Sequence, residues 1–111
     1  MTLEEIQRLV LKGRYNYSDK VRTLIEDGWY SEEDLEYCIR NATEIYKVEK
    51  DELKASVDGK KYVIIWKDTY GCSFYTCGKV IRDEEGKLYF FITAHKADKR
   101  WEECLITFVK N

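Results

Sequence analysis

The stretch SFYTCGKVIRDEEGKLYFFITAH, residues 73–95, decides the fold of this 111-residue chain. Apolar and aromatic residues recur at alternate positions on both sides of the polar tetrapeptide DEEG at 83–86. A period of two is typical of β-strands, and a short polar turn that contains glycine connects antiparallel neighbours. We therefore predict a hairpin with strands over 73–82 and 87–95.

The turn determines which side chains share a face of this hairpin. If Arg82 pairs with Lys87, the alternation separates two sets of residues. The predicted core set is Tyr75, Cys77, Lys79 and Ile81 beside Leu88, Phe90, Ile92 and Ala94. The predicted open set is Phe74, Thr76, Gly78, Val80 and Arg82 beside Lys87, Tyr89, Phe91, Thr93 and His95. The open set is rich in rings, hydroxyls and positive charge, which favours a sheet face that binds a ligand.

Three more segments have the composition of strands, at 44–49, 61–67 and 104–110. Polar turns at 58–59 and at DTYG, 68–71, separate the first strands along the chain. Strands joined by such short turns pair with their sequence neighbours. We therefore expect an antiparallel meander, and we expect Trp101 to fold back onto it.

Residues 1–43 have helical periodicity instead. Capping patterns at Thr2, Ser18 and Ser31 predict three helices, which end near Gly13, Gly28 and Asn41. Helices followed by antiparallel strands predict an α+β fold with the helices packed on one face of the sheet. The length suits a single domain over 1–111.

Composition excludes a disordered tail, because 44% of the residues are hydrophobic and 36% are charged. No apolar run approaches the roughly 20 residues that span a bilayer. The N-terminus, MTLEEIQRLV, carries acidic residues where a signal peptide needs a basic stretch and an apolar block. We therefore expect a cytoplasmic protein with no membrane partner.

The four cysteines are Cys38, Cys72, Cys77 and Cys104. A cytoplasmic chain with a sufficient core needs no disulfides, so we predict free thiols. Cys72 and Cys77 are five residues apart, which places them on opposite faces of a continuous strand and disfavours a zinc site. We expect no metal and no cofactor, and a redox or zinc role for these two cysteines is the alternative.

Charge differs between the two halves of the chain. Residues 1–58 hold 9 Lys and Arg against 14 Asp and Glu, and residues 59–111 hold 10 against 7, which gives −5 and +3. Phosphate contacts dominate the affinity of proteins for nucleic acids. A polyanion partner is therefore expected at the second half, and the alternative is that these charges only solvate the surface.

His95, the one histidine of the chain, is the principal candidate for chemistry. An imidazole titrates near neutral pH and therefore acts as general acid or base at cellular pH. Arg82 and Lys96 complete the predicted catalytic set by supplying positive charge. The alternative is a histidine at a strand end that only forms a hydrogen bond with a loop.

A second candidate surface combines basic and aromatic side chains. The segment RYNYSDKVR, 14–22, contributes Tyr17, Lys20 and Arg22, and the hairpin adds Lys87 and Tyr89. Rings that stack on bases and cations that contact phosphates are typical of RNA-binding sites. The same composition also occurs in ordinary surface loops and helix starts.

The order of several motifs resembles a known family. The segment YSDKVRTLIEDGWYSEEDLEYCIRNATEIYKVEKD is followed by GKKYVII, CGKVI and LYFFITAHKAD, and then by Trp101. This order, over about 15–101, resembles small prokaryotic proteins with a domain of unknown function that look like RelE/ParE-type toxins. They are often encoded beside a zinc-finger antitoxin. Lys20 stands where the family commonly has a histidine, and Leu24 where it has an arginine.

Two hypotheses follow from these patterns and this resemblance. The first is a toxin of a toxin–antitoxin pair that cleaves RNA without a metal, with His95 as acid or base. The second is a non-catalytic domain that binds a protein partner, such as an antitoxin segment, at its sheet face or edge.

Overall fold

The computed structural model describes residues 1–97, and its three helices begin at the predicted capping residues. Thr2 caps α1 (Leu3–Leu11), Ser18 caps α2 (Asp19–Glu26) and Ser31 caps α3 (Glu32–Asn41). Each hydroxyl accepts a hydrogen bond from the amide three residues later. The three predicted helices are therefore confirmed. They could be predicted because capping and periodicity are local properties of the sequence.

Five strands form one mixed sheet in the order β1-β5-β4-β3-β2. They are β1 (Tyr15–Tyr17), β2 (Lys47–Lys50), β3 (Lys60–Lys67), β4 (Ser73–Asp83) and β5 (Gly86–Lys96). The predicted meander is confirmed for β2 to β5, whose neighbours all pair antiparallel. The prediction of a purely antiparallel sheet is wrong, because β1 pairs with β5 in parallel. A strand of three residues is too short to show a period of two.

The predicted strand at 104–110 lies outside the described residues, as do Trp101 and Cys104. The other three cysteines, Cys38, Cys72 and Cys77, are free thiols, as predicted. No helix within residues 1–97 is long and apolar enough to cross a membrane.

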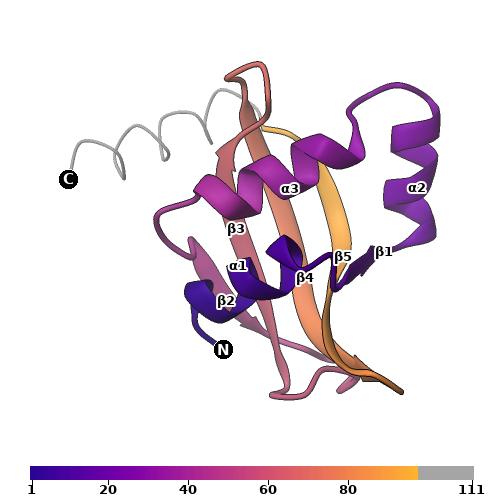
Figure 1. Cartoon of the computed structure of the whole chain (residues 1–111), viewed down its shortest axis with the longest axis vertical. Coiled ribbons are helices and arrows are strands. Elements are labelled where there is room, and N and C mark those ends of the chain that lie inside the picture. Colours follow the sequence, from indigo (N-terminus) through magenta and orange to yellow (C-terminus); the bar gives the residue numbers. More distant parts are fainter. Residues whose placement is uncertain (98–111) are drawn as a thin grey trace.

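All three helices contribute to one core on one side of the sheet. Figure 1 shows α1 and α3 crossing in front of the strands, with α2 at the side where β1 and β5 lie. The largest buried side chains in this core are Ile6, Val21, Leu35, Ile39, Tyr62, Ile64, Phe74, Val80, Tyr89 and Phe91. The predicted α+β layering, with helices on one face, is therefore confirmed.

The assignment of the two faces of the hairpin is wrong for β4 and for β5 as far as Ile92, but it is right for Thr93, Ala94 and His95. The helices cover the set that contains Phe74, Val80, Tyr89 and Phe91, which the sequence places on the open side. The other side carries a smaller apolar cluster of Val63, Ile65 and Cys77, with Tyr46, Tyr75 and Ile92 packed against it. Both sets are apolar at their centres, so alternation alone does not reveal which one the helices cover.

A β-bulge shifts the register within the hairpin. Arg82 pairs with Lys87 as predicted, and the pairing continues in step as far as Gly78 opposite Phe91. Beyond that point Cys77 pairs with Thr93, so Ile92 is the extra residue on β5. A bulge exchanges the faces of the residues that follow it. Ala94 consequently joins the core under the helices, and His95 lies on the opposite side.

Lys79, an unexpected charge among apolar neighbours, is buried on the side of the sheet opposite the helices. Its side chain is 8% exposed, and Nζ lies 3.6 Å from Oδ2 of Asp51, which is 2% exposed. The same carboxylate accepts hydrogen bonds from the amides of Leu53, Ala55 and Ser56. Lys79 therefore ties the β2–β3 connection to the sheet, because a buried ammonium requires a paired anion.

Candidate binding cleft

The three predicted catalytic residues do not lie together. Lys96 pairs with Phe74 at one end of the β4–β5 hairpin, and Arg82 lies eight residues further along β4 at the other end. At about 3.3 Å per residue this separation is about 26 Å. His95 and Lys96 are adjacent in sequence but project from opposite faces of β5. Arg82 therefore lies far from the other two residues, whereas His95 and Lys96 both line one hollow near the end of β5.

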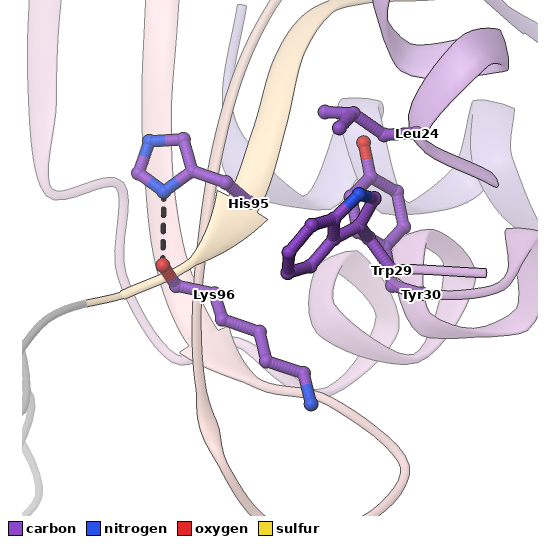
Figure 2. A pocket seen from close by; sticks show the side chains of 5 residues that line it. All are labelled: Leu24, Trp29, Tyr30, His95 and Lys96. Atoms are coloured by element: carbon purple, nitrogen blue, oxygen red, sulfur yellow. Dashed lines mark hydrogen bonds between the residues drawn. The ribbon is translucent and has the colours of Figure 1, made fainter. Parts of the chain in front are cut away.

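His95 is exposed and lies on the side of the sheet opposite the helices. Its imidazole stacks on the ring of Tyr75, with centroids 4.7 Å apart, and Nδ1 lies 3.0 Å from the carbonyl oxygen of Lys96. Figure 2 shows this imidazole on the far side of the end of β5 from Leu24, Trp29 and Tyr30. Both contacts are with strand residues, Tyr75 in β4 and Lys96 in β5, and neither is the hydrogen bond to a loop that the alternative interpretation expects.

The predicted RNA-binding residues divide into separate places. The guanidinium of Arg22 lies over the ring of Tyr17, 5.4 Å from its centroid, and Lys20 is exposed on the same helix start. The hydroxyl of Tyr17, however, donates a hydrogen bond to Glu32, which brings negative charge to this group. Lys87 is exposed at the β4–β5 turn, opposite Arg82.

Tyr89, the remaining predicted RNA-binding residue, is fully buried under the helices. Its ring packs edge-on against Phe91, with centroids 5.1 Å apart, so its faces are not available to stack on a base. Its hydroxyl is buried without a hydrogen-bond partner in the described structure, and burial raises the pKa of this hydroxyl well above the ordinary value. Tyr89 is therefore a core residue.

Replacing Tyr89 with phenylalanine is expected to raise the free energy of unfolding by about 1 kcal/mol, because the buried hydroxyl without a partner is removed. Urea unfolding measures the change. Tyr62→Phe is the matched control: this tyrosine is also buried, but its hydroxyl donates to Asp58, so its removal is expected to cost about 1 kcal/mol. A loss of stability in Tyr89→Phe contradicts the reading of an unpartnered hydroxyl.

A cleft at the end of the sheet that carries the β3–β4 turn has the properties of a binding site. It lies between the α2–α3 connection, the first turn of α3, the β3–β4 turn and the end of β5, and its volume is about 570 Å³. We call it the aromatic cleft; its lining is Ile25, Gly28, Trp29, Tyr30, Ser31, Glu33, Asp34, Asp68, Thr69, Tyr70 and Lys96. Trp29, Tyr30 and Lys96 also line the neighbouring hollow in Figure 2, with Leu24 and His95.

Two rings stand at the rim of the aromatic cleft. Trp29 is 64% exposed and Tyr70 is 86% exposed, and each belongs to a turn between two regular elements. Large exposed aromatic side chains cost free energy in water and are enriched in binding sites. Their position on two different turns, on either side of one hollow, therefore favours a ligand that fits between them.

Two buried polar groups in the lining have no partner in the described structure. Tyr30 is 7% exposed and its hydroxyl has no hydrogen bond; burial raises its pKa to about 12. Asp68 is 1% exposed; Oδ1 accepts from the amides of Tyr70 and Cys72, and Oδ2 has no partner. Such groups are rare in folded proteins because each carries a desolvation cost. The Tyr30 hydroxyl is directed towards Leu24 (Figure 2), so Asp68 Oδ2 is the group that a ligand in this cleft would satisfy.

Asp34 holds the two walls of the aromatic cleft together. Its Oδ2 accepts from the amide and hydroxyl of Ser31, at 2.9 and 3.1 Å, and completes the cap of α3. Its Oδ1 accepts from the amide and hydroxyl of Thr69 in the β3–β4 turn, at 2.9 and 2.7 Å. Burial opposes ionisation of this carboxyl, but the four hydrogen bonds outweigh it and lower the pKa of Asp34.

Sequence reasoning predicted only Lys96 of the aromatic cleft, because most of the other lining residues belong to turns. The segments GWYS at 28–31 and DTYG at 68–71 predict only a helix end, a helix cap and a strand connection. One sequence signal could have indicated it: each of the two turns contains a large aromatic residue, Trp29 or Tyr70, where turns usually have small polar residues. Their meeting depends on the packing of α3 against β3, which the sequence does not show.

Comparison with known proteins found no matching family model, no similar curated protein and no similar solved structure. Within residues 1–97, no cluster of three or more histidine, cysteine, aspartate or glutamate side chains is arranged to hold a metal ion.

Proposed function

We propose that this chain is a non-catalytic interaction domain that binds a protein partner in the aromatic cleft. One observation carries the proposal: a hollow of about 570 Å³ combines two largely exposed rings with a buried carboxylate oxygen of Asp68 that lacks a partner. Aromatic side chains are enriched in protein-recognition sites, where they serve as anchors for a partner.

The competing hypothesis, a metal-independent endoribonuclease, has less support. General acid–base catalysis on RNA requires an imidazole and cations within reach of one phosphate. His95 and Lys96 face opposite ways, and Arg82 lies at the far end of the hairpin. The sheet side that carries His95 is apolar at its centre, where Val63 and Ile65 are buried.

The resemblance to RelE/ParE-type toxins supports one kind of partner within this proposal. A toxin of such a pair binds its antitoxin as a protein ligand. We propose an antitoxin segment as the partner, because this requires the interaction surface and does not require the catalytic set.

Site-specific photo-crosslinking tests the proposal. The photoreactive amino acid benzoylphenylalanine is placed at Trp29 and, in a second variant, at Tyr70, and crosslinks are made in cells that produce the chain. Both positions are expected to give the same protein adduct. The control position is Leu53, which is 81% exposed in the β2–β3 connection, at the opposite end of β3 from Asp68.

The outcomes separate the two hypotheses. One discrete protein adduct from both rim positions, absent at Leu53, supports the interaction domain. Adducts to RNA, or equal adducts from all three positions, contradict it. A parallel RNA-cleavage assay with and without ribosomes is expected to show no activity, and cleavage that is lost in His95→Ala restores the ribonuclease hypothesis.

A further inference from the structure

We propose that the aromatic cleft binds an arginine side chain of the protein partner. This inference rests on the proposed function, and it names the chemical group that enters the cleft. Three features of the cleft support it: the charge of the lining, the Asp68 oxygen without a partner and the two rings at the rim.

The lining of the aromatic cleft is negative. Glu33, Asp34 and Asp68 provide three carboxylates, and Lys96 provides one ammonium group. Lys96 is exposed and forms no ion pair within residues 1–97, so it does not neutralise these carboxylates by direct contact. A cation is therefore attracted into the cleft, and an anion is repelled.

Anion binding at the start of α3 is disfavoured for a second reason. Helix N-termini attract anions through their free amides. At α3 this position is already occupied by the chain itself, because Asp34 accepts from the cap amide and Ser31 accepts from the amide of Asp34. The first turn also carries Glu32 and Glu33. A phosphate or a carboxylate would meet these charges at close range.

The carboxylate oxygen without a partner defines what the cation must offer. Asp68 Oδ2 needs a donor. A guanidinium presents five N–H donors in one plane, whereas an ammonium presents three on a single atom. Arginine therefore supplies a planar, charged donor group to Asp68 Oδ2, and the hydrogen bond to the carboxylate is strengthened by charge.

The rim rings favour the same side chain. A guanidinium stacks on aromatic faces through cation–π attraction, most strongly on tryptophan. Trp29 and Tyr70 are the exposed rings of the cleft, and both lie on surface turns. Because Asp68 Oδ2 is buried, the incoming side chain must displace part of the lining, which surface turns allow more readily than a helix or strand.

A nuclear magnetic resonance titration of the full chain tests the inference. The probe is N-acetyl-arginine amide, and N-acetyl-citrulline amide is its uncharged isostere. Arginine is expected to shift the amide signals of Trp29, Thr69 and Tyr70 in a saturable way, with a Kd at least tenfold below that of citrulline. Increasing the salt concentration is expected to weaken the arginine complex.

Three variants locate the binding group. Asp68→Asn keeps an oxygen for the turn amides but removes the charge, and it is expected to raise the Kd for arginine at least tenfold. Glu33→Gln, on an exposed position, is expected to raise it about threefold, because its contribution is long-range. The control is Glu44→Gln, beyond the C-terminal end of α3, which is expected to leave the Kd within twofold. Unchanged signals outside the cleft show that each variant is folded.

Each outcome has a defined meaning. Selective binding of arginine that is lost in Asp68→Asn supports the inference. Equal shifts with arginine and citrulline, or saturable binding of inorganic phosphate at the same amides, overturn it. A partner crosslinked at Trp29 without any arginine binding overturns the inference alone, whereas arginine binding without a crosslinked protein contradicts the proposed function alone.

Discussion

Replacing Gly78 with alanine is expected to lower the free energy of unfolding by about 3 kcal/mol. An added Cβ would lie 2.5 Å from both Cζ and Oη of Tyr89 on the neighbouring strand. The ring has no space to move away, because Tyr89 is fully buried and packs against Phe91. Accommodating the methyl group therefore requires the strands or the helices above them to shift. Urea unfolding of the two proteins measures the change.

The same substitution in a second variant, Tyr89→Leu, tests whether the loss of stability comes from the ring of Tyr89 or from a general effect of alanine on the backbone. In Tyr89→Leu the outer half of the ring is absent, so the same Gly78→Ala change is expected to cost less than about 1 kcal/mol. The difference between the two costs is the coupling between the methyl group and the ring. An equal cost in both backgrounds would show that alanine destabilises β4 for a reason other than Tyr89.

Gly78 also illustrates why the faces of the hairpin were not predictable. It is the last residue in the predicted register, and the bulge follows between it and Cys77. The sequence contains two apolar alternations on each strand, and the helices cover the one with small residues at Thr76 and Gly78. The space that Gly78 leaves is filled by the ring of Tyr89, and this contact exists only once the two strands are paired.

Local signals predicted the helices and their caps, because a hydroxyl and an amide three residues apart meet within one turn. The meander was predicted for the same reason, since short turns force neighbouring strands together. The parallel strand β1 was missed, because Tyr15–Tyr17 pairs with residues more than seventy positions away. The elements that were predicted correctly depend on contacts between residues close in sequence, whereas the missed strand β1 depends on contacts between residues far apart in sequence.

The candidate site, like strand β1, depends on contacts that the local sequence does not show. His95 attracted attention by its chemistry, but one residue of bulge determines which way it faces. The aromatic cleft joins two turns about forty residues apart, and Asp34 links them by hydrogen bonds to Ser31 and Thr69. A capping pattern predicted the bond of Asp34 to Ser31, whereas nothing in the sequence indicates its bond to Thr69.

Replacing Asp34 with asparagine is expected to lower the free energy of unfolding by about 3 kcal/mol at pH 7. An amide group has one oxygen, so it accepts from either Ser31 or Thr69 and turns an N–H donor towards the other pair. Asp34 is 3% exposed, so water does not replace the missing acceptor. Urea unfolding at constant pH measures the loss. Glu33→Gln, on the exposed neighbour, is the control and is expected to change stability by less than about 0.5 kcal/mol.

The pH dependence of this difference identifies the charge as its source. Burial raises the pKa of Asp34, but hydrogen bonds from Ser31 and Thr69 lower it by more, so the folded value lies below the ordinary 3.8. The unfolded chain therefore binds the proton first as the pH falls. The stabilisation by the ionised carboxyl is complete well above pH 3.8 and is lost as the pH falls through the folded pKa.

The stability difference between the parent chain and Asp34→Asn is consequently expected to be constant from pH 7 to about pH 5 and to shrink below pH 3.8. Other carboxyls with lowered pKa values, such as Asp58 and Asp83, also weaken the fold in acid. They are present in both proteins, so their effects cancel in the difference. A difference that stays constant down to pH 3 would mean that Asp34 acts through its shape and not through its charge. In that case the α3 cap and the β3–β4 turn are joined by packing, and the carboxylate is not what holds the cleft together.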